Sequence, residues 1–335
     1  MKELLERLLN GEDLSSDEAG RIMEGLTDGA LVPAVGGAFL AALRTKGETS
    51  EEVRGFADTM RRLAVPVAVA AEGGPLVDTC GTGGDGSGSL NLSTAAGLIA
   101  AAAGARVVKH GNRSISSRSG SADVLEELGI PIELGPEEAS QFLDAHGFVF
   151  LFAPRYHPAM GTVMPVRRAM GVRTVFNMLG PLSNPAAPPH QVVGAFSLEA
   201  AKLMAHALSR MDVRRAFVVH GALGWDEATP IGPYDLFDVV DGRVHHTQRD
   251  PADVGLSRCT AEDLAGGDAA FNAAALESLL QGQPGAYQDA ACLAAGLALE
   301  VSGMAPDHAS AISMARAAVM DGRTGRLLDA LRGSR

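Results

Sequence analysis

The sequence is poor in aromatic residues, cysteine and lysine, and each shortage narrows what the chain can be. Aromatic residues make up 4% of the 335 residues, so aliphatic side chains must build the core that an apolar content of 46% and a mean hydropathy of +0.10 indicate. The cysteines, Cys80, Cys259 and Cys292, have neither metal-ligand nor disulfide spacing, which favours a reducing cytoplasm. Lysine occurs only at positions 2, 46, 109 and 202, so Lys109 stands out within a polar segment.

The sequence lacks the features that mark membrane proteins, secreted proteins and nucleic-acid-binding proteins. No apolar run reaches the ~18 residues that a membrane-spanning helix requires, so no membrane partner is expected. The charged, amphipathic start of the chain does not fit a signal peptide. A formal net charge of −12 disfavours nucleic acid as a partner, because phosphate neutralisation needs clustered basic residues. A small anionic substrate needs only local positive charge and stays compatible with this composition.

The apolar periodicity changes along the chain. Residues 1–66 carry a helical pattern, in which Ser15–Glu18 and Thr49–Glu52 fit helix capping boxes. From residue 76 the pattern alternates between strand and helix. The expected strands are 76–78, 106–109, 148–152, 191–196 and 216–220, and the expected helices are 93–103, 121–128, 137–146, 198–210 and 269–280.

Residues 158–182 interrupt this alternation with a second helical pattern. We therefore predict the α/β fold class with two domains: a helical domain of residues 1–70, to which residues 160–188 return, and an α/β domain of residues 71–335. The sheet is expected to be mixed and mostly parallel. Two chain crossings between the domains would form a hinge with a cleft beneath it. The last third, residues 250–335, is expected to be helix-rich.

The segment 78–94, Asp-Thr-Cys-Gly-Thr-Gly-Gly-Asp-Gly-Ser-Gly-Ser-Leu-Asn-Leu-Ser-Thr, is the most informative. A short strand enters a glycine loop, and Asn91, Ser93 and Thr94 then open an alanine-rich helix. Glycines let backbone N–H groups approach a ligand, and a helix start adds unpaired N–H groups and a positive dipole end. The pattern predicts a phosphate site in which Asp85 could hold a hydroxyl or a metal-bound water. A flexible Gly/Ser linker is the alternative.

Residues 81–86 also read G-x-G-x-x-G, the fingerprint of dinucleotide-binding folds. In those folds the helix opens inside the motif, and an acidic residue follows about 20 residues later. Here the expected helix begins near Ser93, well past the motif, and the next strand ends in Lys109 and His110. This context disfavours NAD, and the P-loop pattern is absent.

A second polar loop, residues 110–121, follows the next expected strand and carries Arg113 and Arg118. If the two strands are parallel neighbours, both loops lie at the carboxyl edge of the sheet, where α/β folds bind ligands. Adjacent anion-binding loops indicate a ligand with phosphate at both ends. A solvated basic loop is the alternative. His110 is placed to face the ligand, although the pattern does not assign it as a base.

An acidic pair, Asp226 and Glu227, follows another apolar strand. Mg²⁺ prefers one or two carboxylates together with phosphate oxygens and water, which fits this pair, whereas a surface turn is its commoner meaning. His220, at the end of that strand, is interpreted as structural. Arg167 or Arg168, on the returning helix, could meet a carboxylate through a forked contact or could simply face solvent.

Taken together, these segments resemble the anthranilate phosphoribosyltransferases of tryptophan biosynthesis. The resemblance covers nearly the whole chain in the family's order. It departs at Ser89, where threonine is common, and at Trp225, where an aliphatic residue is more usual. The motifs that carry it are residues 81–85, 91–94, 109–113, 119–129, 157–160, 173–182 and 226–227.

The resemblance implies the fold of nucleoside phosphorylases and phosphoribosyltransferases. It implies Mg²⁺-dependent transfer of phosphoribose from phosphoribosyl pyrophosphate to the amino group of anthranilate, by a cytoplasmic homodimer joined through its helical domains. Two competitors stay open. A pyrimidine nucleoside phosphorylase should carry a threonine- and glycine-rich loop around residues 109–128. A non-catalytic nucleic-acid-binding relative would need a basic surface and neither Asp85 nor the acidic pair.

The resemblance and the loops together give the expected site residues. Catalysis is expected to involve Lys109, His110, Asp226 and Glu227, and Mg²⁺ is expected at Ser93, Asp226 and Glu227. The expected anthranilate-binding residues are Gly81, His110, Asn112 and Arg167. The expected phosphoribosyl pyrophosphate-binding residues are Gly81, Gly84, Asp85, Ser89, Asn91, Ser93, Thr94, Lys109, Arg113, Ser117 and Ser121.

The reaction that the resemblance implies does not require a general base on the enzyme. The aromatic amine is already neutral at pH 7, so its attack on the sugar needs no prior deprotonation. Catalysis can rest on positioning the amine and on stabilising the leaving pyrophosphate with Mg²⁺ and Lys109. No covalent nucleophile is required, and none is evident in the sequence.

Overall fold

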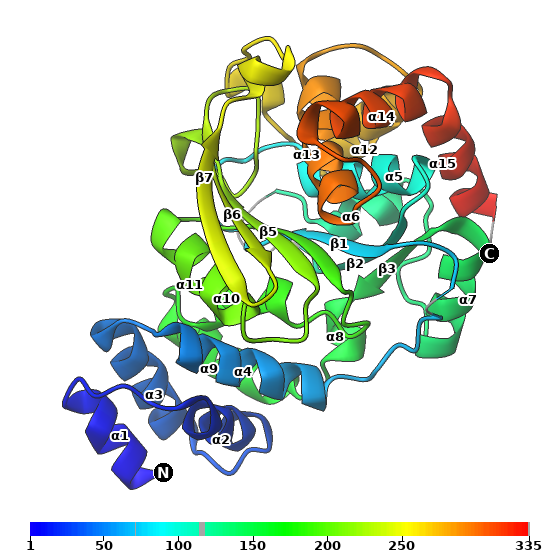
Figure 1. Cartoon of the computed structure of the whole chain (residues 1–335). Coiled ribbons are helices and arrows are strands. Elements are labelled where there is room, and N and C mark those ends of the chain that lie inside the picture. Colours follow the sequence, from blue (N-terminus) through cyan, green and yellow to red (C-terminus); the bar gives the residue numbers. More distant parts are fainter. Residues whose placement is uncertain (71, 114–117, 334–335) are drawn as a thin grey trace.

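The computed structural model describes residues 1–70, 72–113 and 118–333. The amino-terminal part is a helical bundle, as the periodicity predicts, and it lies below the α/β part in Figure 1. Both expected capping boxes form: Ser15 and Thr49 accept hydrogen bonds from the backbone N–H groups of Glu18 and Glu52. The bundle consists of α1 (Lys2–Leu9), α2 (Ser16–Thr27), α3 (Pro33–Lys46) and α4 (Ser50–Leu63).

The α/β part is built on a seven-stranded sheet of order β3-β2-β1-β4-β5-β6-β7. The first five strands in chain order are parallel, and β6 and β7 are antiparallel, which confirms the predicted mixed sheet. Strands β1 and β2 are neighbours, so their following loops share the carboxyl edge. The strands are β1 (Leu76–Gly81), β2 (Arg106–Gly111), β3 (Phe148–Phe152), β4 (His190–Gly194), β5 (Arg215–His220), β6 (Tyr234–Val240) and β7 (Arg243–Arg249).

The hairpin formed by β6 and β7 was not predicted. β7 reads Arg-Val-His-His-Thr-Gln-Arg and is mostly exposed, so it lacks the apolar alternation that marks a strand with one buried face. A turn signal was nevertheless present. Asp241 and Gly242 have φ of 50° and 71°, the left-handed pair that an Asp-Gly hairpin turn adopts.

Helices cover both faces of the sheet (Figure 1). One face packs under α5 and α13, which are almost entirely buried, and the other under α11. The helices of this part are α5 (Leu92–Ala102), α6 (Ser121–Glu127), α7 (Pro136–His146), α8 (Ala153–Tyr156), α11 (Leu198–Leu208), α12 (Ala269–Leu280), α13 (Ala286–Val301), α14 (His308–Met320) and α15 (Arg323–Gly333), with 3₁₀ turns at Ala222–Gly224, Pro251–Val254 and Glu262–Leu264. No helix among the described ranges is both long and apolar enough to cross a bilayer.

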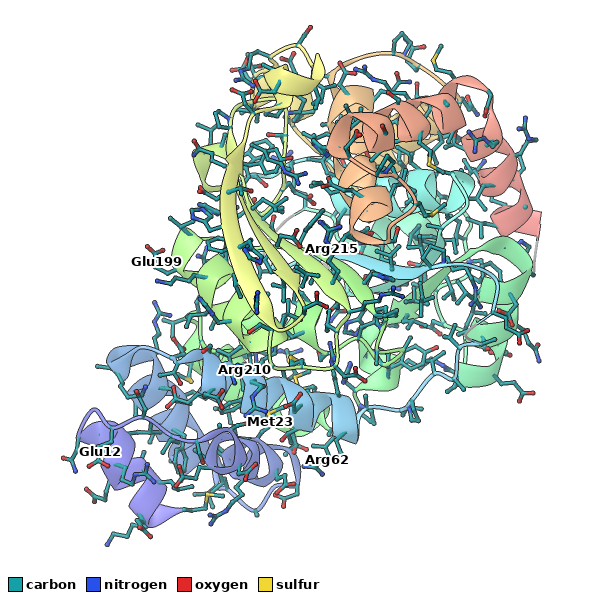
Figure 2. All side chains as sticks on the ribbon, viewed as in Figure 1. Glu12, Met23, Arg62, Glu199, Arg210 and Arg215 are labelled. Atoms are coloured by element: carbon teal, nitrogen blue, oxygen red, sulfur yellow. The ribbon has the colours of Figure 1, made fainter. Side chains whose placement is uncertain are left out.

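Between β3 and β4 the chain leaves the α/β alternation in α9 (Met160–Met170) and α10 (Phe176–Leu182). α9 packs on α2 and α3, where Val163 and Val166 enter the core of the bundle. α10 contacts α4, α11 and the strands β1 and β2. One apolar core therefore runs from the bundle, where Figure 2 marks the buried Met23, to the face of the sheet that α11 covers.

Candidate active site

The glycine loop that follows β1 needs its glycines mainly for their backbone conformation. Gly83, Gly84, Gly86 and Gly88 have φ between 60° and 80°, and a Cβ at any of them would meet no atom within 4 Å. Gly81 is different, because its Cβ would lie 2.5 Å from Asp226 Oδ2. The loop is thus open to a ligand on one side and closely packed against Asp226 at its start.

Asp226 fastens this loop to the segment that follows β5. Its Oδ2 accepts a hydrogen bond from the backbone N–H of Gly83 at 2.6 Å, and its own N–H donates to Asp85 Oδ2 at 3.2 Å. Asp85 Oδ1 also accepts hydrogen bonds from the backbone N–H and the hydroxyl of Ser87, at 3.0 and 2.8 Å. The predicted phosphate loop and the predicted acidic pair therefore form one hydrogen-bonded unit.

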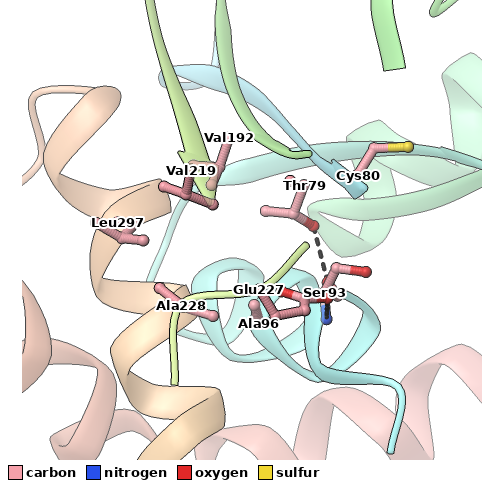
Figure 3. A pocket seen from close by; sticks show the side chains of 11 residues that line it. Thr79, Cys80, Ser93, Ala96, Val192, Val219, Glu227, Ala228 and Leu297 are labelled. Atoms are coloured by element: carbon pink, nitrogen blue, oxygen red, sulfur yellow. Dashed lines mark hydrogen bonds between the residues drawn. The ribbon is translucent and has the colours of Figure 1, made fainter. Parts of the chain in front are cut away.

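The start of α5 brings together the other charged groups. Glu227 Oε1 accepts a hydrogen bond from the Ser93 N–H at 3.1 Å, where a helix N-terminus favours negative charge. The buried Lys109 ammonium donates to Ser93 Oγ at 3.2 Å and to the Thr79 carbonyl oxygen at 2.5 Å. The Thr79 hydroxyl donates to the Ser93 carbonyl at 2.9 Å, as Figure 3 shows. Ser93 is thus the meeting point of β1, β2 and Glu227.

A cavity of about 10 Å³ lies behind these groups, lined by Thr79, Ser93 and Glu227 on its polar side and by Val219 and Leu297 on its apolar side (Figure 3). That volume admits about one water molecule. This cavity is therefore too small to hold a substrate.

The acidic groups are held in an unfavourable electrostatic setting. Burial raises the pKa of Asp226, and the neighbouring charge of Asp85 raises it further. Burial and the charge of Asp226 raise the pKa of Glu227 in the same way, against the opposing effect of Lys109. A bound cation would favour the ionised forms of both carboxyl groups.

The donor set fits Mg²⁺, a hard cation that binds through one or two carboxylates and completes its shell with phosphate oxygens and water. Among the residues the structure describes, no group of three or more histidine, cysteine or acidic side chains is arranged to hold a metal by itself. A cation at Asp226 and Glu227 would therefore depend on oxygen atoms from a ligand.

His110 is buried beside a second histidine, His157. Its Nδ1 lies 3.2 Å from the Gly180 carbonyl oxygen, which can only accept, so Nδ1 carries the proton. The centres of the two rings are 5.1 Å apart, and each has a buried Nε2 that finds no partner in the described part of the chain. Burial lowers the pKa of His110 to about 3 and that of His157 to about 4, and the neighbouring His157 also lowers that of His110. Both rings are neutral at pH 7.

No role was predicted for His157, although it lies in one of the family motifs. A second buried histidine with an unpartnered nitrogen next to His110 marks it as a candidate ligand contact. The available signal was a histidine at, or shortly after, the end of each of two expected strands. The parallel register of β2 and β3 brings those two strand ends together.

Arg167 lies on α9, half-buried, with its guanidinium 5.0 Å from the centre of the Phe176 ring. No carboxylate pairs with it within the described ranges, and its closest polar contact is Met164 Sδ at 3.9 Å. Burial lowers the pKa of its guanidinium. Arg168, the alternative, is exposed. Arg167 is therefore a cation in a partly apolar place without a counter-charge.

The described residues of the second loop that were predicted to bind substrate contact their own loop and α6. Arg113 is exposed, and it pairs with Asp123 and Glu126 of α6, at 3.0 and 2.8 Å, so its charge is already balanced within its own loop and helix. Asn112 is exposed, and its carbonyl oxygen accepts a hydrogen bond from Ser121 Oγ at 3.3 Å. The predicted Ser117 lies outside the described residues.

The remaining predicted residues lie along the glycine loop and α5. Asn91 does not cap α5 with its side chain, because its Oδ1 accepts a hydrogen bond from Asn272 Nδ2 at 2.9 Å. Ser89 Oγ lies 3.2 Å from Ser87 Oγ. The buried Thr94 hydroxyl has no partner among the residues that the structure describes.

The family is shown by similarity over the whole chain. A model of the glycosyl transferase family a/b domain matches residues 73–325, and a model of that family's helical bundle domain matches residues 2–64. The anthranilate phosphoribosyltransferase of Chloroflexus aggregans is 46% identical over 96% of this chain and 95% of its own. The chain belongs to the anthranilate phosphoribosyltransferase family.

Solved structures of the anthranilate phosphoribosyltransferase family are similar in fold as well. The enzyme from Thermus thermophilus matches with a TM-score of 0.92 and 42% identity, over 98% of each chain. The Saccharomyces cerevisiae enzyme in complex with PRPP and Mg matches with a TM-score of 0.89 and 26% identity, over 98% of this chain and 96% of its own. The same yeast enzyme in complex with 4-fluoroanthranilate matches with a TM-score of 0.87 and 25% identity, with the same coverage.

Proposed function

We infer that this protein transfers the phosphoribosyl group of phosphoribosyl pyrophosphate to the amino group of anthranilate and releases pyrophosphate, a step of tryptophan biosynthesis. One observation carries this inference: the glycine loop, the start of α5, Lys109 and the acidic pair meet at one edge of the sheet. Its full-length relatives bear the name of this activity. Residues 109–113 read Lys-His-Gly-Asn-Arg, not the loop expected of a pyrimidine nucleoside phosphorylase.

The phosphoribosyl pyrophosphate site is proposed to lie over the glycine loop and the start of α5. Backbone N–H groups that the left-handed glycines expose can donate to phosphate oxygens, and the orphaned Thr94 hydroxyl supplies a further donor. Asp85 is proposed to hold the ribose hydroxyls. The other proposed contacts are Gly81, Gly84, Ser89, Asn91, Ser93, Lys109 and Ser121.

Mg²⁺ is proposed to be held by Asp226 and Glu227, with Ser93 beside them. When bound there, the cation offsets the negative charge that develops on the pyrophosphate as its bond to C1 breaks. Lys109 adds a fixed positive charge at Ser93, where the same charge develops.

The anthranilate site is proposed to lie between α9 and His110. The unpaired guanidinium of Arg167 is suited to the anthranilate carboxylate, since a forked contact binds both of its oxygens. Because His110 Nδ1 is the protonated nitrogen, Nε2 can accept a hydrogen bond from the anthranilate amine. A pKa of about 3 makes this ring a weak base, so His110 is proposed to orient the amine without removing its proton first. Gly81 and Asn112 are the remaining proposed contacts.

The larger-scale proposals follow from the fold. Residues 1–70 with 160–188 are proposed to move as one domain against the rest, and the homodimer is proposed to form through the bundle. Leu9 on α1 and Val32 just before α3 are 65% and 60% exposed, and a contact through the bundle would cover them. The reaction is proposed to take place in the cytoplasm.

An assay of anthranilate fluorescence tests the proposal directly. Fluorescence should fall when phosphoribosyl pyrophosphate and Mg²⁺ are both present, and should stay constant when either is left out. Phosphorolysis of thymidine or uridine with no consumption of anthranilate would instead assign the protein to the pyrimidine nucleoside phosphorylases.

A further inference from the structure

The glycine loop is held from two sides. On the side of the sheet, the Thr82 N–H donates to the Gly194 carbonyl oxygen at 2.9 Å, and Asp226 accepts from Gly83 as described above. On the other side, the guanidinium of Arg173 donates to the carbonyl oxygen of Gly84. Arg173 lies in the connection between α9 and α10, which is not part of the sheet or of its covering helices.

The Arg173 side chain also stacks on Phe196, a residue that contacts the start of the glycine loop. Its guanidinium lies 4.5 Å from the centre of the Phe196 ring, which follows β4. The Phe196 N–H donates to Thr82 Oγ1 at 3.1 Å, and that hydroxyl lies 3.4 Å from Asp226 Oδ2. An arginine can stack its planar face on a ring while its edge donates hydrogen bonds, which a lysine cannot do equally well. The stacked ring thus fixes the direction in which Arg173 reaches Gly84.

The backbone of Arg173 is held by the helical bundle. Its carbonyl oxygen accepts a hydrogen bond from Arg44, in the last turn of α3. The preceding helix, α9, packs on α2 and α3 and carries Arg167, the proposed partner of the anthranilate carboxylate. Arg173 therefore joins the segment proposed to bind one substrate to the loop proposed to bind the other.

We propose that Arg173 is a positioning residue that couples the two substrate sites. Through the Gly84 carbonyl it holds the glycine loop in the conformation that receives phosphates, and through its backbone it links that conformation to the placement of α9. Thermodynamic linkage requires the coupling to be reciprocal: each substrate improves the binding of the other by the same factor. The proposal rests on the proposed function for the identity of the substrates.

Two variants of Arg173 test the coupling. Arg173→Gln removes the positive charge and the planar guanidinium that stacks on Phe196, whereas Arg173→Lys keeps the charge and can still donate hydrogen bonds but has no planar group to stack. With both substrates varied, Arg173→Gln should raise the KM for phosphoribosyl pyrophosphate about tenfold, since one charge-assisted hydrogen bond is lost. The factor by which phosphoribosyl pyrophosphate improves anthranilate binding should fall towards one, while kcat at saturation changes little. Arg173→Lys should recover part of both effects.

Arg210→Gln is a matched control, because Arg210 is an exposed arginine just after α11 that makes no side-chain hydrogen bond or ion pair within the described ranges. Arg210→Gln should leave unchanged both the KM for phosphoribosyl pyrophosphate and the factor by which phosphoribosyl pyrophosphate improves anthranilate binding. Phosphoribosyl pyrophosphate binding is also measured by calorimetry in the absence of anthranilate. If the parent binds phosphoribosyl pyrophosphate but does not use anthranilate, the proposed function fails, and weaker calorimetric binding by Arg173→Gln still supports the positioning role.

Two results would overturn the proposal. One is an unchanged KM and an unchanged coupling factor in a folded Arg173→Gln variant. The other is a fall in kcat alone, which would place Arg173 in the chemical step. If Arg173→Gln does not fold, Phe196→Leu removes the ring beneath the guanidinium and keeps the arginine. That variant should raise the same KM by a smaller factor, and unchanged constants in the folded variant would equally reject the proposal.

Discussion

At the scale of single residues, the site combines charges that have partners with charges that lack them. Asp226 and Lys109 are engaged by the backbone and by Ser93, whereas Arg167 has no counter-charge in the part of the chain that the structure describes. A half-buried cation without a partner costs stability unless a ligand supplies the missing charge. Mutation of a residue that binds substrate is therefore expected to change substrate binding without disturbing the loops, whose hydrogen bonds involve other residues.

Arg167→Ala should weaken anthranilate binding and leave phosphoribosyl pyrophosphate binding largely intact. The lost contact to a charged group is worth roughly 1.5–3 kcal/mol, or about one to two decades in the KM for anthranilate. Steady-state kinetics with each substrate varied in turn gives both constants. Arg168→Ala is the matched control, and a larger rise in KM for that variant would assign the carboxylate contact to Arg168.

The double variant Asp226→Asn, Glu227→Gln keeps the size of both side chains and removes two negative charges. It should fold, lose most of kcat and require more Mg²⁺ for the activity that remains. Because Asp226 accepts from Gly83 at 2.6 Å, the amide should still hold the loop through its oxygen. Initial rates measured across a Mg²⁺ titration decide the matter: superimposable curves for variant and parent would exclude both residues from metal binding.

At the scale of elements, the hairpin of β6 and β7 is fastened to α13 and α14 by a buried ionic cluster. Arg249, at the end of β7, donates two hydrogen bonds to Glu300, at 2.6 and 2.8 Å. His308 Nδ1 lies 3.2 Å from the same carboxylate, and its Nε2 lies 3.1 Å from the Tyr234 hydroxyl. Burial alone would raise the pKa of Glu300, but the contacts with His308 and Arg249 outweigh it and lower that pKa to about 2.

This cluster predicts a pH-dependent stability. A carboxyl group whose pKa is lower in the folded chain stabilises it above the unfolded pKa of about 4.3, and the contribution is lost as the pH falls towards 2. Glu300→Gln should therefore lower the free energy of unfolding by on the order of 3 kcal/mol at pH 7, and by about half as much at pH 3. Denaturant unfolding at both values measures this.

The more exposed ion pair between Glu277 and Arg332 supplies the control for that measurement. Glu277→Gln should change stability by less than about 1 kcal/mol, since exposed pairs contribute little. An equal loss at pH 7 and pH 3 for Glu300→Gln would show that packing, not charge, is responsible.

Sequence reasoning found the five parallel strands and missed the antiparallel hairpin of β6 and β7. The strands β1 to β5 are buried apolar runs between turn residues, and all were predicted within a few residues. β7 has polar side chains along its length because it is an edge strand, so periodicity could not reveal it. The acidic pair and both loops follow strands and could be placed from the parallel order alone. The partners of Arg113 depend on side-chain packing, which no local pattern encodes, whereas the pairing of His110 with His157 follows from the parallel register of β2 and β3.

At the scale of the whole molecule, the bundle and the α/β part share one core. Phe56 of α4 packs edge-on against Phe176 of α10 at 6.3 Å, and the apolar layer continues through α11 to β5. Any movement of the bundle must therefore slide α4 and α10 over α11, with no separate interface to open. Small shifts are compatible with such packing, whereas detachment of the bundle would expose its apolar core.

This continuity predicts that the bundle does not melt separately. The only tryptophan, Trp225, is buried beside the acidic pair, so its fluorescence reports on the α/β part. The bundle is helical, so its unfolding would reduce the circular dichroism signal of helices. Thermal unfolding followed by tryptophan fluorescence and by far-ultraviolet circular dichroism should give coincident transitions. An early loss of helical signal at unchanged fluorescence would indicate that the bundle unfolds first.

The polar edge strand β7 has a consequence for how copies of the chain meet. An open edge offers unpaired backbone groups to any passing strand, and natural sheets guard such edges with charged side chains. β7 carries Arg243, Arg249 and two adjacent histidines, and the opposite edge, β3, is flanked by α7. The edge formed by β7 is thus protected against strand addition. Two copies can therefore come together at this edge without their sheets merging, because its backbone is flanked by charged side chains.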